Sequence, residues 1–212
     1  MKKAKKALAI LLCAALLVGG TIAGTVAYLT AKTGPVTNTF TAGNVAITLD
    51  ELDVDNDDNK NDNVTTADGK VRDTANSYNL IPGETYVKDP TVHVAANSET
   101  SWIFVKVENG LVNYEAANGK TIAEQIEDNG WELVSGTTNV YSQKFVKDSA
   151  KLDYVVFEEF TINSNQVLGD IWSAVASKNI TVTAYAVQAS NGNGEFTAAQ
   201  AWAQAWAQAP KA

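Results

Sequence analysis

Scarcity of several residue types limits what this chain can do. Its 212 residues include one Cys, one His and one Met. A single cysteine cannot form an internal disulfide or a thiolate zinc site, and a single histidine excludes any mechanism that needs two imidazoles. Basic residues are also few, with 16 Lys and Arg against 24 Asp and Glu and a net charge of -8. Because binding to phosphates needs a basic face, we expect no nucleic-acid partner.

Recognisable catalytic motifs are missing as well. The common zinc-protease motif needs two histidines four residues apart, and this chain has only His93. His93 lies within Thr91–Ala95, which has the pattern of a regular strand, so we expect a structural histidine. Glu158 and Glu159 are the obvious carboxylate pair, but neighbours in a strand point to opposite faces of a sheet. We therefore predict that the chain is not an enzyme.

What the chain does contain begins with an export signal. Four lysines stand within Met1–Lys6, the stretch Ala7–Val18 is densely apolar, and small residues lead up to Ala27. A positive region, a short apolar region and small residues before the cut are typical of a secretory signal peptide over residues 1–27. We expect cleavage between Ala27 and Tyr28.

Cleavage changes the protein that has to fold. It leaves 185 residues with no cysteine and with 12 basic against 24 acidic residues. The mature protein would be secreted or held at the cell surface, with no membrane contact of its own. The alternative is an uncleaved membrane anchor, because the uncharged stretch 7–31 is long enough to span a bilayer. Its glycines and threonines favour the cleaved form.

Most of the mature chain has the alternation of β-strands. Residues 41–212 are expected to form a single domain, and residues 28–40 an extension before it. The capping pairs Thr121 with Glu124 and Thr197 with Gln200 predict a short helix over 120–129 and a C-terminal helix. Expected strands are 38–49, 90–96, 101–108, 131–134, 140–146, 154–162 and 180–188, with a further helix over 167–175. This is a mainly β pattern, and we predict a jelly-roll-like β-sandwich with short helical insertions and a C-terminal helix.

One long polar segment interrupts the β pattern. Residues 50–79 are expected to be a loop, and within it residues 53–63 hold five Asp and four Asn. Dense oxygen ligands suit calcium, so calcium is a candidate cofactor. The candidate ligands are Asp53, Asp55, Asp57 and Asp58. The segment lacks the Gly and Glu of an EF-hand loop, and the alternative is a solvated acidic loop without a metal.

The C-terminal helix carries a short repeat. Ala-Trp-Ala-Gln occurs twice, which places Trp202 and Trp206 one helical turn apart on one face. Either this face docks on the body of the domain, or it presents an aromatic patch to a partner.

Three segments resemble one protein family. They are the leader with Gly19-Gly20-Thr21 and Thr25–Thr30, the segment Asn38–Glu51, and the segment from Pro82-Gly83 to Lys88-Asp89-Pro90. Together they resemble the exported TasA/camelysin family of Gram-positive bacteria, whose leaders are cut by a SipW-type signal peptidase. The rest of the chain resembles this family more loosely.

The resemblance implies a structural role. Family members form jelly-roll subunits of the extracellular biofilm matrix, and they polymerise when the N-terminal segment of one subunit adds a strand to the next. Here residues 28–40 would be the donor. The residues expected to contact the next subunit are Tyr28, Leu29, Val36 and Phe40. Two alternatives stay open: a camelysin-like cell-surface metalloprotease, and a calcium-dependent surface adhesin.

Overall fold

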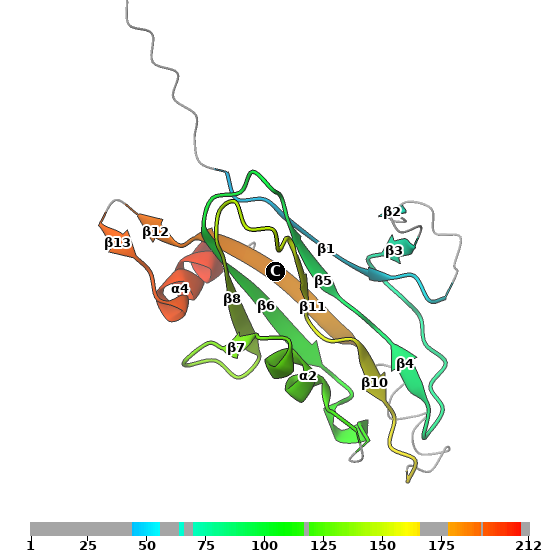
Figure 1. Ribbon diagram of the computed structural model, residues 1–212. Helices are drawn as coiled ribbons and strands as arrows, with labels where there is room; N and C mark the ends of the chain where they lie inside the picture. The colour runs from blue at the N-terminus through cyan, green and yellow to red at the C-terminus, as the bar shows by residue number, and fades with distance from the viewer. Residues whose placement is uncertain are drawn as a thin grey trace, which may run out of the picture. The chain divides into compact units, whose positions relative to one another are not determined.

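Strands dominate the part of the chain that the structure describes. The computed structural model describes residues 44–55, 64–65, 70–116, 119–165, 178–191 and 193–208. These residues belong to one compact unit, residues 42–212. Its described helices are α2 (Ile122–Asp128), α4 (Ala198–Gln208) and a short 3₁₀ helix, η1 (Val112–Tyr114) (Figure 1). The prediction of a mainly β fold with a C-terminal helix is therefore confirmed. The jelly-roll connectivity stays a prediction.

One sheet is built around a long central strand. Its order is β11 (Ile180–Gln188), β6 (Ser101–Asn109), β8 (Val140–Phe145) and β7 (Glu132–Leu133), with all pairs antiparallel. The β6 strand is paired on both sides. A turn at Ser135-Gly136 joins β7 to β8, and Gly136 supplies the positive φ of 84° that this turn needs.

A second sheet contains shorter strands. Its order is β2 (Val64–Thr65), β3 (Val71–Asp73), β1 (Ile47–Leu52), β5 (Thr91–Val94) and β9 (Asp153–Val155). Two small ladders complete the β structure. They pair β10 (Glu159–Thr161) with β4 (Thr85–Val87), and β12 (Ser190–Asn191) with β13 (Gly194–Glu195).

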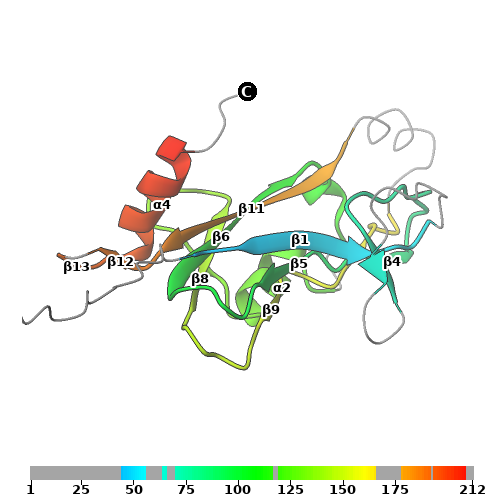
Figure 2. The same ribbon diagram turned by 90° about the horizontal axis from the view of Figure 1, so that it is seen from above.

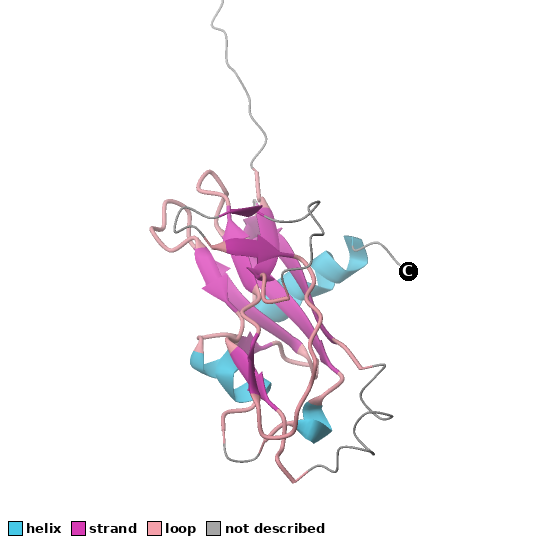
Figure 3. Ribbon diagram, turned by 90° about the vertical axis from the view of Figure 1, so that its right-hand side faces the viewer, coloured by secondary structure: helices cyan, strands magenta, loops and turns pink. Residues whose placement is uncertain are grey.

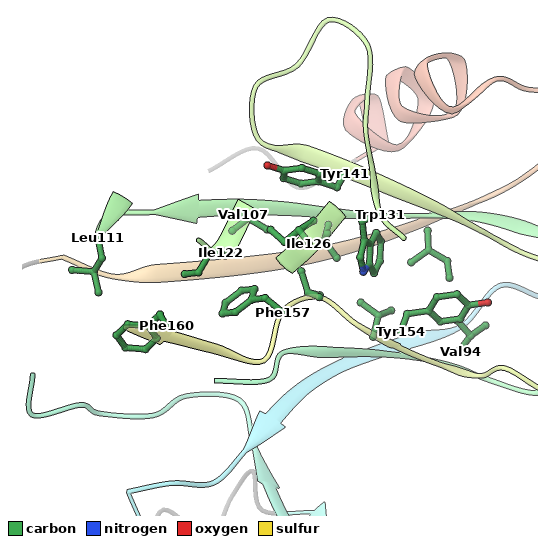
Figure 4. Close-up of a cluster of buried hydrophobic side chains, with 14 of the residues drawn as sticks. Val94, Val107, Leu111, Ile122, Ile126, Trp131, Tyr141, Tyr154, Phe157 and Phe160 are labelled. Atoms are coloured by element: carbon green, nitrogen blue, oxygen red, sulfur yellow. The ribbon is translucent and has the colours of Figure 1, made fainter. Parts of the chain in front are cut away.

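The two sheets share the main hydrophobic core. Valines of β5 and β6, together with Trp131, Phe157 and Tyr154, are buried between them. Helix α2 adds Ile122 and Ile126, which lie four residues apart on its buried face (Figure 4). The Thr121 and Glu124 capping box at its N-terminus is also present. Burial of this kind stabilises a domain by about 1.5–3 kcal/mol per large apolar side chain.

The opposite face of the β11–β6–β8–β7 sheet is covered by α4. The helix begins at its predicted capping pair and buries Ala201 and Ala205 against the sheet. The Trp202 ring packs against Phe104 and Tyr185, with centroids 5.4 and 5.2 Å apart. Figure 2 shows α4 and β1 on opposite sides of β11, and Figure 3 shows the strands gathered between the helices. The docking interpretation of this helix is confirmed, although Trp206 is 51% exposed.

Two sequence predictions are corrected by the structure. The single strand expected over 154–162 is two strands, β9 and β10, in different ladders, because buried Val156 and Phe157 turn the chain into the core between them. The segment 50–79 is not one loop. It contains the end of β1 and the strands β2 and β3, because its charged side chains pair with one another in the folded protein.

Several predictions concern residues outside the described ranges. They include the signal peptide 1–27 with the Ala27–Tyr28 cleavage site, the donor segment 28–40 with Leu29, Val36 and Phe40, the first residues of the 38–49 strand, Asp57, Asp58 and the helix 167–175. Among the described helices, none combines the length and apolar character needed to cross a bilayer.

Candidate functional site

The outer edge of β11 is the most distinctive feature of the described surface. Strand β11 pairs with β6 along all nine residues, and no other described strand pairs with its second edge. Hydrogen bonds from Gly110 N to Asn179 O and from Ala189 N to Thr100 O show which residues face β6. In antiparallel pairing the bonded residues alternate, so the N–H and C=O groups of intervening residues point away from β6. These residues are Ile180, Val182, Ala184, Ala186 and Gln188.

The sequence of β11 leaves this edge open to another strand. Natural edge strands are blunted by charged side chains, proline, bulges or short length. Residues 180–188 read Ile-Thr-Val-Thr-Ala-Tyr-Ala-Val-Gln and contain none of the charged residues or prolines that would do this. The side chains of Ile180, Val182 and Ala184 reach the main core yet are only partly buried. The edge therefore offers both backbone groups and incompletely covered apolar side chains.

Strand β1 presents a shorter free edge beside β11. The hydrogen bond from Ala95 N to Ala46 O fixes the alternation of the β1–β5 ladder. By that alternation, the backbone groups of Ile47 and Leu49 point away from β5, and β3 pairs only with Glu51 and Leu52 further along. Strands β1 and β11 are in contact across the sandwich. Both sheets thus reach this side of the molecule with edges to which no described strand is hydrogen-bonded.

A cleft of about 750 Å³ opens next to these edges. One wall is the start of β11 with Lys178, and the other is formed by β1, β3 and the segment after β3. Its lining is apolar at Leu80 and Phe160 and polar at Glu51 and Asp73. A pocket with an apolar floor and a few fixed polar groups is suited to receive a side chain or a small ligand.

Charged side chains beside the cleft form a connected network. Arg72 donates to Asp50 through Nε and to Asp89 through Nη1, the latter at 3.0 Å. Nearby, the ammonium of Lys88 is paired with Glu51, whose other oxygen accepts a 2.9 Å hydrogen bond from Asn76 Nδ2. Arg72, Lys88 and Glu51 are buried. Because a buried charge is stable only when paired, this network fixes the position of β3 against β1.

His93 joins the network to the far edge of the same sheet. Its Nε2 lies 2.9 Å from Asp50 Oδ1, and its Nδ1 lies 2.7 Å from Asp153 Oδ1. Partial burial opposes the charge of His93, but its hydrogen bonds to Asp153 and Asp50 raise the pKa of the imidazole above its usual value. Through its two ring nitrogens, the imidazole therefore links β1, β5 and β9.

The predicted calcium ligands are only partly within the described chain. Asp53 and Asp55 follow β1 directly, and the Oδ2 atom of Asp55 accepts a 2.5 Å hydrogen bond from Ser77 N. Asp57 and Asp58 lie outside the described ranges. Within those ranges, no group of three or more His, Cys, Asp or Glu side chains is arranged to hold a metal ion.

Sequence reasoning missed the residues that shape the cleft. Arg72 and Asp73 were assigned to a loop because polar residues surround them, although Val71 and Arg72 continue a ladder with β1 and β2. The available signal was the lone arginine: this is the only Arg in the chain, and arginine is the preferred partner of buried carboxylates. Comparison of the chain with protein-family models, with curated proteins and with solved structures finds no match.

Proposed function

We propose that this chain is a secreted structural subunit of an extracellular, biofilm-type matrix, and that it assembles into fibres by strand addition. After removal of the leader by a SipW-type signal peptidase, the N-terminal segment 28–40 of one copy would pair with β11 of the next. The observation that carries the proposal is the nine-residue edge of β11, which no other described strand covers.

The physics of strand addition accounts for the fit. An exposed edge binds an extended peptide through main-chain hydrogen bonds, while side-chain pockets select its sequence. Each such bond contributes about 0.5–1.5 kcal/mol net, so several of them together give a stable contact. The partly buried residues Ile180, Val182 and Ala184 would be covered by apolar residues of the donor, such as Leu29 or Val36.

Electron microscopy of two forms of the protein tests the proposal. The mature chain beginning at Tyr28 is compared with a chain beginning at Thr41, which keeps the compact unit, residues 42–212, and lacks the donor. We expect fibres from the first and monomers from the second. Monomers from both forms across calcium concentration and pH would refute strand addition. Stoichiometric, tightly bound zinc in a proteolytically active preparation would favour the metalloprotease alternative instead.

A further inference from the structure

The carboxylate of Asp73 lacks a counter-charge. Asp73 is 2% exposed, and its Oδ1 accepts a 2.5 Å hydrogen bond from Thr74 N. In the described part of the chain no other group bonds to this carboxylate, and no Lys, Arg or His nitrogen lies within ion-pair distance of it. Two cations of this region are engaged elsewhere, Arg72 by two aspartates and Lys88 by Glu51. A buried carboxylate without a partner is unfavourable, so this position is suited to a cation from elsewhere.

Asp73 belongs to the lining of the cleft, although little of its surface is exposed. It pairs directly across from Glu51 of β1, and it lines the cleft whose opposite wall is the start of β11. Burial raises the pKa of the Tyr78 phenol in the same cleft, and the charges of Glu51, Asp89 and Asp55 raise it further. Among the side chains that line the cleft, the carboxylates of Asp50, Glu51 and Asp73 outnumber the ammonium groups of Lys88 and Lys178, which favours a positively charged ligand.

The coordination available fits an ammonium group better than a metal ion. Both oxygens of Glu51 accept hydrogen bonds, one from Asn76 and one from Lys88. Among the described residues, only Thr74 N bonds to Asp73, through Oδ1, so the other oxygen of Asp73 has no protein partner there. Calcium takes six to eight oxygen ligands. A single carboxylate oxygen instead matches one charge-assisted hydrogen bond from a lysine.

The sequence points to the source of that lysine. Lys32 is the only charged residue between Lys6 and Asp50, and it lies in the proposed donor segment 28–40. The cleft and the free edge are continuous, because Ile180, Thr181 and Val182 belong to both. A donor strand on the start of β11 would run past the mouth of the cleft, and Lys32 is the one charged residue of segment 28–40 that it could bring there.

We propose that the cleft is a receptor for a basic side chain, in which Asp73 binds the ammonium of Lys32 from a second copy of the chain. This inference rests on the proposed function and adds to it the contact that sets the position of the donor. One charge-assisted hydrogen bond contributes about 1.5–3 kcal/mol, which corresponds to about a ten- to hundredfold change in binding.

The test measures the critical concentration for fibre formation by sedimentation of the mature chain. Lys32→Glu and Asp73→Asn should each raise it by about ten- to hundredfold. The charge-swapped double variant Lys32→Glu with Asp73→Lys should recover most of the loss. Lys178→Glu is the matched control: it makes the same charge change on the opposite wall of the cleft, and it should have a much smaller effect.

The outcomes separate this inference from the proposed function. If deletion of residues 28–40 abolishes fibres but Lys32→Glu leaves the critical concentration unchanged, the pairing is overturned while strand addition stands. An equal effect of Lys178→Glu and Lys32→Glu would also overturn it, because the effect would then be one of general charge. If the deleted chain still polymerises, both proposals are wrong. Lys32 precedes the compact unit, residues 42–212, so its variant keeps the test valid even if the Asp73 variants fold poorly.

Discussion

A proline placed on the outer side of β11 gives the sharpest test of the free edge. The N–H group of Ala186 points away from β6, so Ala186→Pro removes a donor from the edge and leaves the β6–β11 ladder intact. Edge strands tolerate proline in this orientation. An incoming strand would lose one hydrogen bond and leave a carbonyl unpaired, at a cost of about 1–3 kcal/mol. The critical concentration for fibres should then rise by about ten- to hundredfold.

The neighbouring residues provide a matched control. Thr183 pairs with Lys106 and directs its N–H toward β6, so Thr183→Pro removes a hydrogen bond within the sheet and should destabilise the monomer by about 3 kcal/mol or more. Urea unfolding followed by tryptophan fluorescence measures the stability of both variants, and sedimentation measures their assembly. If Ala186→Pro assembles at the concentration of the unmodified chain, or if it unfolds as readily as Thr183→Pro, the assignment of β11 as a free edge is wrong.

Three further predictions concern the framework that holds the edge. Arg72→Met should lower the free energy of unfolding by about 3–5 kcal/mol, because it removes the buried cation that pairs with Asp50 and Asp89. Urea unfolding measures this free energy, and a change below about 1 kcal/mol would contradict the prediction. Since Asp153 and Asp50 raise the pKa of His93 above its usual value of 6.5, the charged ring stabilises the fold fully below about pH 6.5, and this contribution is lost as the pH rises through the folded pKa. His93→Gln should therefore flatten the decline in melting temperature above that pH, and an unchanged profile would refute the bridge. Trp202→Ala should lower the melting temperature by about 5–10 °C, because a half-buried ring that packs on β6 and β11 is lost; an equal effect of Trp206→Ala, at the exposed end of the helix, would contradict this.

Strong periodicity in the sequence predicted the elements that are held by apolar packing. Strand β11 was predicted with the bounds that the structure shows, and β6 to within one residue, because both are rich in β-branched and aromatic residues. Helix α2 followed from its capping box, Thr121 with Glu124. In each case the local preference and the tertiary packing favour the same conformation, which is the condition under which sequence patterns succeed.

Predictions failed where tertiary contacts decide the structure. The end of β1 and most of β3 are Asp, Glu and Arg residues, whose local preference is for a loop, and in the folded protein they are held as strands by ladder pairing and by ion pairs such as that of Arg72 with Asp50. The split between β9 and β10 was hidden because buried apolar residues stand on both sides of the exposed Glu158 and Glu159. A pattern of burial does not show that a chain passes from one sheet to another.

The free edge could not be predicted either, because being an edge is a property of topology. The apolar pattern of β11 is equally typical of a central strand. Only the strand order shows that one side of β11 has no partner among the described residues. This distinction changes the interpretation of the sequence 180–188: its lack of charge is ordinary inside a sheet, but at an edge it leaves the strand unprotected.

Charge explains how such an edge could select a donor without general aggregation. The predicted mature chain has 12 basic against 24 acidic residues, so two whole subunits repel each other when their edges approach. The segment 28–40 carries one charge, and that charge is positive. It can approach the edge and the acidic cleft without this repulsion, whereas pairing of β11 with β11 of a second copy would bring two acidic bodies together. Raising the salt concentration should therefore increase edge-to-edge association, and weaken any contact between Lys32 and Asp73, so that fibre order falls as disordered aggregation rises.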